Sequence, residues 1–216
     1  MSYLLQNEAV FGIILIMILS LSLTFMVACH EVNSNEAPIW NQLSLEEGDI
    51  VYRRGSSLAS QVVLASDTRG NYSHIGIIVR DSGAYKVVHA VPGESEPGAP
   101  DLVKMDPLRD FFADNRAVAG EIMRLEMNDS LRSLVAENAK DCYFRDAPFD
   151  HHYDLSGQTE LYCTELIWFV FKTIDIDITR NSRTHVNFLS FKGDFIFPSD
   201  ISNNTNLISI YSFNNH

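Results

Sequence analysis

Cys163 is the residue of this chain best placed to act as a nucleophile. It stands where a polar stretch becomes apolar, in the sequence LYCTELIWFVF of residues 161–171. The dense apolar residues that follow predict a buried helix over residues 164–174, so the thiol would lie at its amino end. Unpaired backbone N–H groups and the positive end of the helix dipole favour a thiolate there and can stabilise an oxyanion. The alternative is a small core residue, the usual role of a free cysteine.

Two histidines could act as a base and its orienting partner. Residues 74–79 (HIGIIV) and 85–91 (YKVVHAV) are rich in β-branched side chains and flank the turn DSGA at 81–84, which predicts a hairpin. If the turn contains an even number of residues, the numbers of any two paired residues add up to 165, so His74 pairs with Val91. His89 is then a diagonal neighbour of His74 on the same face of the hairpin, roughly 7–8 Å away. A three-residue turn would turn His89 to the other face. A lone histidine at a strand end can also be purely structural, but the pair fits the base and orienter that an activated nucleophile requires.

The remaining pattern predicts an α+β fold with an antiparallel sheet packed on helices. Strands and helices follow one another without the regular alternation of a parallel sheet. Further strands are expected at 48–53, at 118–125 and in two segments near the C-terminus (195–198 and 208–211), and helices at 58–65 and 130–143.

These residues in this order resemble the permuted papain-like thiol hydrolases of the YaeF/YiiX type, relatives of the NlpC-type cell-wall peptidases and of lecithin-retinol acyltransferase. In ordinary papain-like enzymes the cysteine precedes the histidine, whereas in this branch the histidine hairpin comes first. The resemblance covers most of residues 46–211 and implies a circularly permuted papain-like fold. It rests on GDIV (48–51), SHIGI (73–77), VVHA (87–90), APFD (147–150), YCTELIW (162–168) and FPSDI (197–201).

The resemblance implies a role for three residues. Cys163 matches the nucleophile, His74 matches the general base, and His89 falls where relatives place a Glu or a His as the third polar group. A histidine there brings no fixed negative charge to support an imidazolium. A mild departure is Thr164, which stands where serine is more usual.

A second departure concerns the oxyanion hole. Phe149 occupies a position where many relatives have a tyrosine, whose hydroxyl could face the oxyanion. The remaining donors for that role are Tyr153 and the backbone N–H of Cys163. Loss of one such donor can slow catalysis about 10²–10³-fold.

The amino end of the chain predicts a membrane-directed segment. Residues 9–29 carry no charge, and a run of about 20 apolar residues can span a bilayer. The run ends in MVAC at 26–29, which resembles a lipoprotein cleavage box in which Cys29 would be lipidated. An uncleaved anchor and an ordinary cleaved signal are the alternatives, and all three place the rest of the chain outside the cytoplasm. We therefore expect a leader over 1–29, a tether over 30–45 and one catalytic domain over 46–216.

Composition excludes several classes of protein. The 216 residues include 28 acidic and 16 basic side chains, a net charge of −12, which argues against a general nucleic-acid binder. Three cysteines cannot form a disulfide framework. No cofactor and no metal are expected, because the adjacent His151 and His152 would point to opposite faces of a strand and no ligand cluster of recognisable spacing accompanies them.

Other polar and aromatic residues have simpler interpretations. We expect the acidic residues of the Pro/Gly-rich loop 92–101 to form a solvated rim, and the remaining large apolar candidates to lie in the core. The rim residues are Glu94, Glu96 and Asp101, and the core residues are Phe111, Phe112, Cys142 and Trp168.

The resulting hypothesis is a cysteine hydrolase of the bacterial cell envelope that forms an acyl-enzyme. The substrate bond would be an amide, such as a peptide link in or near the cell wall. A lipid ester or thioester hydrolase or an acyltransferase of the same fold is the close alternative, and a long apolar groove rather than a short polar one would favour it. A lipoprotein that binds without catalysis is the alternative from another class.

Overall fold

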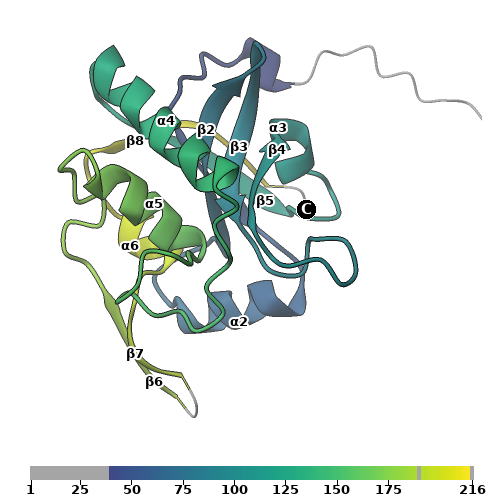
Figure 1. Ribbon diagram of the computed structural model, residues 1–216, viewed down its shortest axis with the longest axis vertical. Helices are drawn as coiled ribbons and strands as arrows, with labels where there is room; N and C mark the ends of the chain where they lie inside the picture. Colours follow the sequence, from purple (N-terminus) through teal and green to yellow (C-terminus); the bar gives the residue numbers. More distant parts are fainter. Residues whose placement is uncertain (1–38, 189–190, 215–216) are drawn as a thin grey trace, which may run out of the picture. The chain divides into compact units, whose positions relative to one another are not determined.

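The computed structural model describes residues 39–188 and 191–214 (Figure 1). The expected leader, with Cys29 and most of the tether, lies outside the described residues. The compact unit that carries all of the elements below runs from Trp40 to the C-terminus. Within the described residues, no helix is long and apolar enough to cross a membrane.

A six-stranded sheet in the order β4-β3-β2-β1-β5-β8 forms the centre of the domain. Each pair of neighbouring strands is antiparallel, so the fold is α+β with an antiparallel sheet, as the sequence predicts. A separate two-stranded sheet is formed by the hairpin β6-β7. The strands are β1 (Ile50–Arg54), β2 (His74–Asp81), β3 (Ala84–Ala90), β4 (Val103–Pro107), β5 (Ala119–Leu125), β6 (Thr184–Phe188), β7 (Phe191–Phe195) and β8 (Leu207–Asn214).

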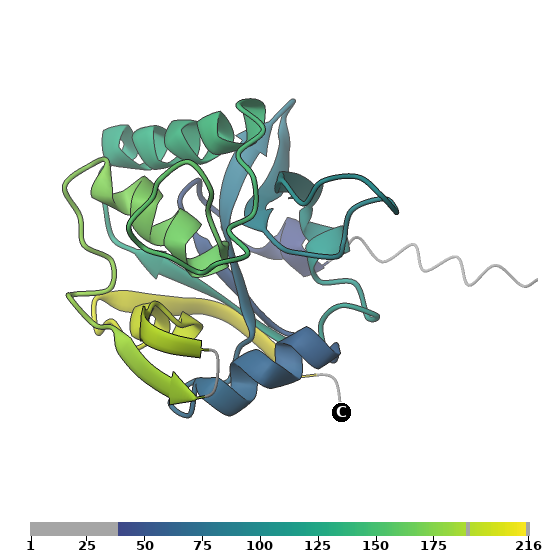
Figure 2. The same cartoon turned by 60° about the horizontal axis from the view of Figure 1, so that its bottom comes forward.

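Two helices, α4 and α5, lie side by side and cover one face of the sheet (Figure 1). Their apolar sides pack on the alternate residues of β1 to β3 that point to this face, such as Ile50, Ile75 and Ile77. Figure 2 brings α2 forward at one end of the sheet. The helices are η1 (Ile39–Gln42), α2 (Leu58–Ser66), α3 (Leu108–Phe111), α4 (Asp129–Phe144), α5 (Cys163–Lys172) and α6 (Pro198–Ser202).

The other face of the sheet carries a second apolar cluster built around Phe111 and Phe112. The last residues of the expected tether belong to this cluster: Trp40 stacks on Phe112 with ring centroids 6.3 Å apart, and Leu45 is buried. These residues therefore pack on the sheet instead of forming part of a free tether.

The hairpin β2-β3 has the predicted register. Its paired positions sum to 165, from Ile77 opposite Val88 to Asp81 opposite Ala84. Ser82 and Gly83 both have positive φ, 51° and 83°, which is the geometry of the tight turn that matches the twist of the strands. A two-residue turn therefore places His74 and His89 on the same face of the sheet.

Some elements have no clear sequence signal. Strand β4 and the short helix α3 follow the Pro/Gly-rich loop, and their residues VKMDPLRDF show no pattern that predicts regular structure. Both lie beside β3. They add the polar and aromatic surroundings of the histidine pair described next.

Candidate active site

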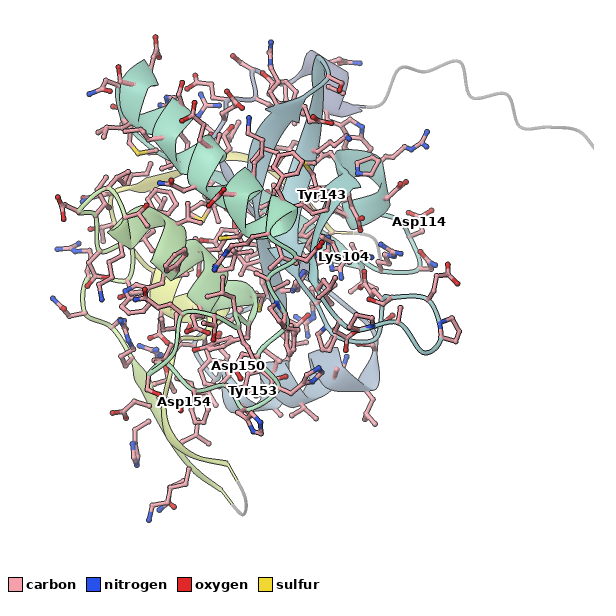
Figure 3. All side chains as sticks on the ribbon, viewed as in Figure 1. Lys104, Asp114, Tyr143, Asp150, Tyr153 and Asp154 are labelled. Atoms are coloured by element: carbon pink, nitrogen blue, oxygen red, sulfur yellow. The ribbon has the colours of Figure 1, made fainter. Side chains whose placement is uncertain are left out.

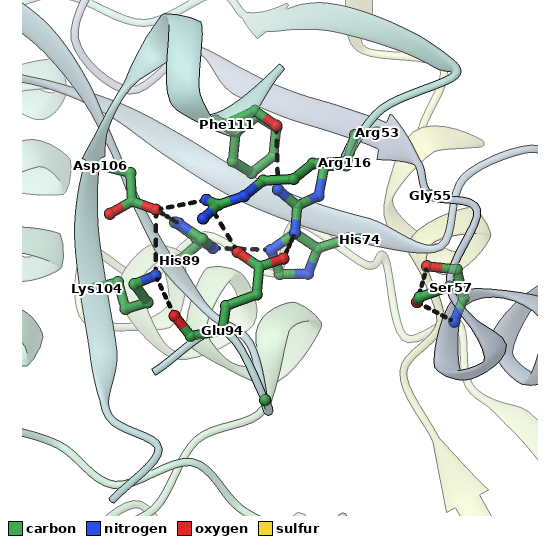
Figure 4. A network of polar contacts seen from close by, with 12 residues as sticks. Arg53, Gly55, Ser57, His74, His89, Glu94, Lys104, Asp106, Phe111 and Arg116 are labelled. Atoms are coloured by element: carbon green, nitrogen blue, oxygen red, sulfur yellow. Dashed lines mark hydrogen bonds and ion pairs between the residues drawn. The ribbon is translucent and has the colours of Figure 1, made fainter. Parts of the chain in front are cut away.

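His74 and His89 form a hydrogen-bonded pair on the face of the sheet that carries Phe111. Nε2 of His74 lies 2.9 Å from Nδ1 of His89, and both side chains are buried. Figure 4 shows the pair at the centre of a network of polar contacts. The register predicted from the sequence places the two residues on one face, and the structure joins their rings directly.

Gly76 makes room for this contact. By the register of the hairpin it lies across from His89, and a Cβ built on it would come within 3.2 Å of the His89 Cβ and within 3.1 Å of the Val88 carbonyl oxygen. That spacing is tighter than ordinary van der Waals contact. The atom nearest to such a Cβ is Cγ1 of Val87, closer still than these two, so a side chain at position 76 would force Val87 to move and would crowd His89 beside His74.

Asp106 holds the far side of His89. Its Oδ2 lies 3.2 Å from Nε2 of His89, and Lys104 and Arg116 approach the same oxygen at 3.4 and 3.3 Å. Burial raises the pKa of Asp106, but the hydrogen bonds with His89 and Lys104 and the charge of Lys104 outweigh it and hold that pKa well below its usual range. The carboxylate is therefore ionised at neutral pH and supplies the negative charge that His89 itself lacks.

This carboxylate also fixes the tautomers of both histidines. An ionised carboxylate only accepts hydrogen bonds, so Nε2 of His89 carries the proton. Burial lowers the pKa of His89, opposed by Asp106, so His89 is neutral and its Nδ1 accepts a hydrogen bond from the Nε2–H of His74. Burial, followed by the charges of Arg53, His89 and Lys104, also lowers the pKa of His74. Nδ1 of a neutral His74 is consequently left with a free lone pair, as a general base requires.

Phe111 packs against three members of this network. Its ring lies 5.6 Å from the His74 ring, 5.2 Å from the His89 ring and 4.8 Å below the guanidinium of Arg53. Nη1 of Arg53 donates a hydrogen bond to the Phe111 carbonyl oxygen at 3.0 Å. Phe111 is a core residue, as expected, and it also fixes the orientation of both rings.

Cys163 is the first residue of α5 and is partly exposed. The backbone N–H groups of Thr164 and of Ile75, the residue after His74, act to lower the pKa of its thiol. Burial raises the pKa of the thiol to about 11 and outweighs these N–H groups and the charge of Arg53. The start of the helix does favour the thiolate, as expected, but the loss of solvation exceeds this stabilisation and the net shift of the pKa is upward.

The start of α5 is fixed by contacts to a distant segment. Thr164 Oγ1 donates to the Ile196 carbonyl oxygen at 2.6 Å, and the Tyr162 hydroxyl accepts from the Ile196 N–H at 3.1 Å. Glu165, at the third helical position, accepts from the Tyr162 N–H at 3.4 Å. These contacts hold the residues on both sides of Cys163, at the start of the helix that packs on β2.

Tyr153 lies in the loop between α4 and α5, where Figure 3 labels it with Asp150 and Asp154. Its backbone is left-handed, with φ 55°, and its ring packs against Phe149 and Tyr162. Burial raises the pKa of Tyr153, and the neighbouring charge of Cys163 raises it further. Its ring centroid lies 5.4 Å from that of Tyr162, the residue before Cys163, so Tyr153 remains the candidate side-chain oxyanion donor, while Phe149 is buried and brings no hydroxyl.

Other residues singled out from the sequence lie apart from this site. Cys142 is buried in α4, as expected for a core residue. His151 is exposed and lies 3.4 Å from Asp101. Within residues 39–188 and 191–214, no three His, Cys, Asp or Glu side chains are grouped so that they could hold a metal ion.

Glu94 differs from its sequence interpretation. It was expected on a solvated rim, but its carboxylate forms an ion pair with the buried guanidinium of Arg53 and lies 3.1 Å from Arg116. Glu96, two residues further along the loop, is exposed as expected. Sequence reasoning missed Asp106, Arg53 and Arg116, because no local motif marks them and their contacts join segments far apart in the chain.

The arrangement of the histidine hairpin before the cysteine helix defines a permuted papain-like protein. The family described as "permuted papain-like amidase enzyme, YaeF/YiiX, C92 family" matches residues 44–203, and the chain belongs to this family. The comparison supports a hydrolase of the papain-like type.

A solved structure shares the fold. The crystal structure of the "metalloprotein yiiX" from Escherichia coli O157:H7 superimposes with a TM-score of 0.62 at 16% identity, over 78% of this chain and 97% of that one. No curated protein sequence matches the chain significantly. That protein is called a metalloprotein, whereas the part of this chain that the structure describes contains no group of three His, Cys, Asp or Glu side chains that could hold a metal ion.

Proposed function

We propose that this protein is a cysteine amidase in which Cys163 attacks the carbonyl carbon of an amide and His74 is the general base. The proposal is supported above all by the chain of contacts from His74 through His89 to Asp106, which leaves one nitrogen of His74 free to take a proton. Membership of an amidase family supports the choice of bond. The proposal that the two side chains meet is supported by the packing of α5, which begins at Cys163, against β2, which begins at His74.

Acylation begins from a neutral thiol and a neutral imidazole. His74 Nδ1 takes the proton of Cys163 as the sulfur bonds to the carbonyl carbon, because the resting cysteine is not a thiolate. The imidazolium that forms donates from Nε2 to His89, and the Asp106 carboxylate stabilises its charge through His89. The tetrahedral intermediate then expels the amine, which takes the proton from His74 and leaves an acyl-enzyme.

Deacylation repeats these roles with water. His74 removes a proton from a water molecule, whose oxygen attacks the thioester carbon. Expulsion of the Cys163 sulfur with the returned proton releases the carboxylic acid. Through both steps the backbone N–H of Cys163, at the start of α5, and the Tyr153 hydroxyl are the proposed oxyanion donors.

The proposed substrate is a peptide amide of the cell envelope, reached outside the cytoplasm by a protein held to the membrane through its amino-terminal segment. This location rests on the uncharged run of residues 9–29 and on the cysteine that ends it. Incorporation of labelled palmitate that disappears in Cys29→Ala would support lipidation, and unchanged incorporation would contradict it.

The catalytic proposal is tested by the selective reaction of Cys163. A thiol-directed peptide electrophile is expected to modify Cys163 near pH 7 much faster than Cys142, and His74→Ala is expected to remove the difference. Cys142→Ala is the matched control and should leave the labelling rate unchanged. Equal reactivity of the two cysteines in the folded protein would contradict an enzyme.

Hydrolysis of model substrates then identifies the bond. Cys163→Ala should abolish cleavage of short peptide amides. Cleavage of long-chain lipid esters by the wild type, with no cleavage of peptide amides, would instead support the lipid alternative.

A further inference from the structure

Arg53 is a buried cation beside the proposed catalytic base. It lies directly across from His74 in the pairing of β1 with β2, its side chain is only 4% exposed, and its guanidinium and the His74 ring both pack on Phe111. Its positive charge also acts on both Cys163 and His74 and lowers the pKa of each. A group bound to Arg53 would therefore lie within the reacting centre.

The partner of Arg53 comes from a loop that is anchored at few points. Glu94 belongs to the Pro/Gly-rich segment of residues 92–100, which has no regular secondary structure. Gly93 and Gly98 in this segment have no neighbouring atom within 4 Å of an added Cβ. Arg53, Arg116 and Lys104 all contact Glu94, the last through its carbonyl oxygen at 3.1 Å. Glu94 is thus the residue through which the loop reaches the histidine network (Figure 4).

Glu94 leaves part of the hydrogen-bonding capacity of the Arg53 and Arg116 guanidinium groups unused. Its Oε1 accepts from Nη2 of Arg53, while the other terminal nitrogen of Arg53 bonds to the Phe111 carbonyl oxygen. Its Oε2 is buried and faces Arg116 at 3.1 Å without the geometry of a hydrogen bond. Guanidinium groups bind carboxylates most strongly through two parallel hydrogen bonds, which Glu94 does not form.

The local charge is also unusual for this chain. Among the residues that the structure describes, Arg53, Lys104 and Arg116 form ion pairs with the carboxylates of Glu94 and Asp106, which leaves one positive charge in excess beside two neutral histidines. The whole chain carries a net charge of −12. A positive centre at the proposed active site of an acidic protein favours a substrate that carries a negative group.

We propose that Arg53 and Arg116 recognise a carboxylate of the peptide substrate, and that Glu94 occupies their site as an internal carboxylate until the substrate displaces it. The substrate class is then an acidic peptide, with a free carboxylate close to the amide that is cleaved. This inference rests on the proposed function, because it assumes that Cys163 attacks the same substrate.

The test uses peptide chloromethyl ketones that differ only in Glu or Gln at each of the three residues before the electrophile. The rate of Cys163 modification is followed by mass spectrometry. Wild-type protein should react faster with the Glu form at one position. Glu94→Gln should increase that preference about tenfold, since the peptide carboxylate can then form a charge-assisted hydrogen bond with Arg53 and Arg116 without competition from the Glu94 carboxylate. Glu96→Gln, in the exposed part of the same loop, is the matched control and should change neither rate.

The double variant Arg53→Gln/Glu94→Gln should show no preference between the Glu and Gln forms. It also keeps the test informative if Glu94→Gln does not fold, because removing both charges leaves no unpaired buried ion. The proposal is overturned if the wild type shows no preference for Glu at any position, or if Glu94→Gln accelerates both forms equally, as a purely steric cover would. If neither form modifies Cys163 faster than Cys142 in any variant, the proposed function itself fails.

Discussion

The carboxylate of Asp106 accepts a hydrogen bond from His89 at 3.2 Å, and the protonation state of His74 follows from this contact. His89 has a single acceptor nitrogen once Nε2 carries its proton, and that nitrogen lies 2.9 Å from His74. Asp106, on the edge strand β4, thus determines through the ring of His89 which nitrogen of His74 carries the proton. Asp106 is a positioning residue, since the contacts described for it are to side chains of this network.

Replacement of Asp106 is expected to lower activity without changing the fold. Asp106→Ala should reduce kcat/KM about 100-fold, because the tautomer of His89 is no longer fixed and the imidazolium of His74 loses its charge partner. Asp106→Asn keeps an acceptor oxygen near His89 and should cost about tenfold. Exposed Asp114→Asn is the control. Nitrogen-15 NMR of the histidine rings reports the tautomers, and unchanged spectra and kinetics in Asp106→Ala would contradict the assignment.

The reactivity of Cys163 is expected to increase with pH well beyond neutrality. Because burial raises the pKa of the thiol to about 11, the thiolate fraction should grow about tenfold per pH unit between pH 7 and 10. Alkylation by iodoacetamide in a Cys142→Ala background measures this rate. A plateau reached below pH 7 would instead indicate a preformed thiolate–imidazolium pair.

Glu165 is expected to destabilise the protein at alkaline pH. Burial raises its pKa to about 8, with smaller contributions from Asp150 and Asp154, while the Tyr162 N–H lowers it. The folded state therefore binds more protons than the unfolded state between about pH 4.5 and 8, so stability contributed by the neutral form is lost as pH rises through that window.

Glu165→Gln should consequently raise the free energy of unfolding at pH 9 by roughly 2–4 kcal/mol and change it little at pH 4.5. Urea denaturation at the two pH values measures the effect, and exposed Glu160→Gln is the control. A loss of stability at pH 9 would show that the ionised Glu165 is needed at the helix start.

Gly76→Ala is expected to weaken both stability and activity. The added Cβ would crowd His89 and the Val88 carbonyl oxygen, at a cost of about 1–3 kcal/mol, and would move the His89 ring away from His74. Thermal unfolding and kcat are the measurements. Gly157→Ala, where an added Cβ meets nothing within 4 Å, should leave both unchanged, and full activity in Gly76→Ala would show that the His74–His89 contact tolerates displacement.

Tyr153→Phe tests the oxyanion hole. If the phenol donates a hydrogen bond to the developing oxyanion, kcat should decrease about 100-fold with little change in KM. Tyr143→Phe, a tyrosine on α4, is the control. An unchanged kcat would leave the backbone N–H of Cys163 as the donor and assign Tyr153 a packing role against Phe149 and Tyr162.

The sequence determined the local features of this protein. The turn residues Ser82 and Gly83 set the hairpin register, and that register placed His74 and His89 on one face. The change from polar to apolar residues at Cys163 marked the start of α5 to within one residue, since the helix predicted from residue 164 begins at Cys163. These features follow from backbone geometry and hydrophobic periodicity over a few neighbouring residues, which a sequence displays directly.

Tertiary structure decided the electrostatics of the site. Asp106 reaches His89 from a strand with no clear sequence signal, and Glu94 reaches Arg53 from a loop that looked solvated. The pKa of Cys163 is set by burial against β2 and not by its helix terminus alone. These two contacts and this pKa depend on segments that are distant in the sequence and exclude water from one another in the fold. The desolvation of a side chain follows from that packing, so a local pattern of residues cannot predict it.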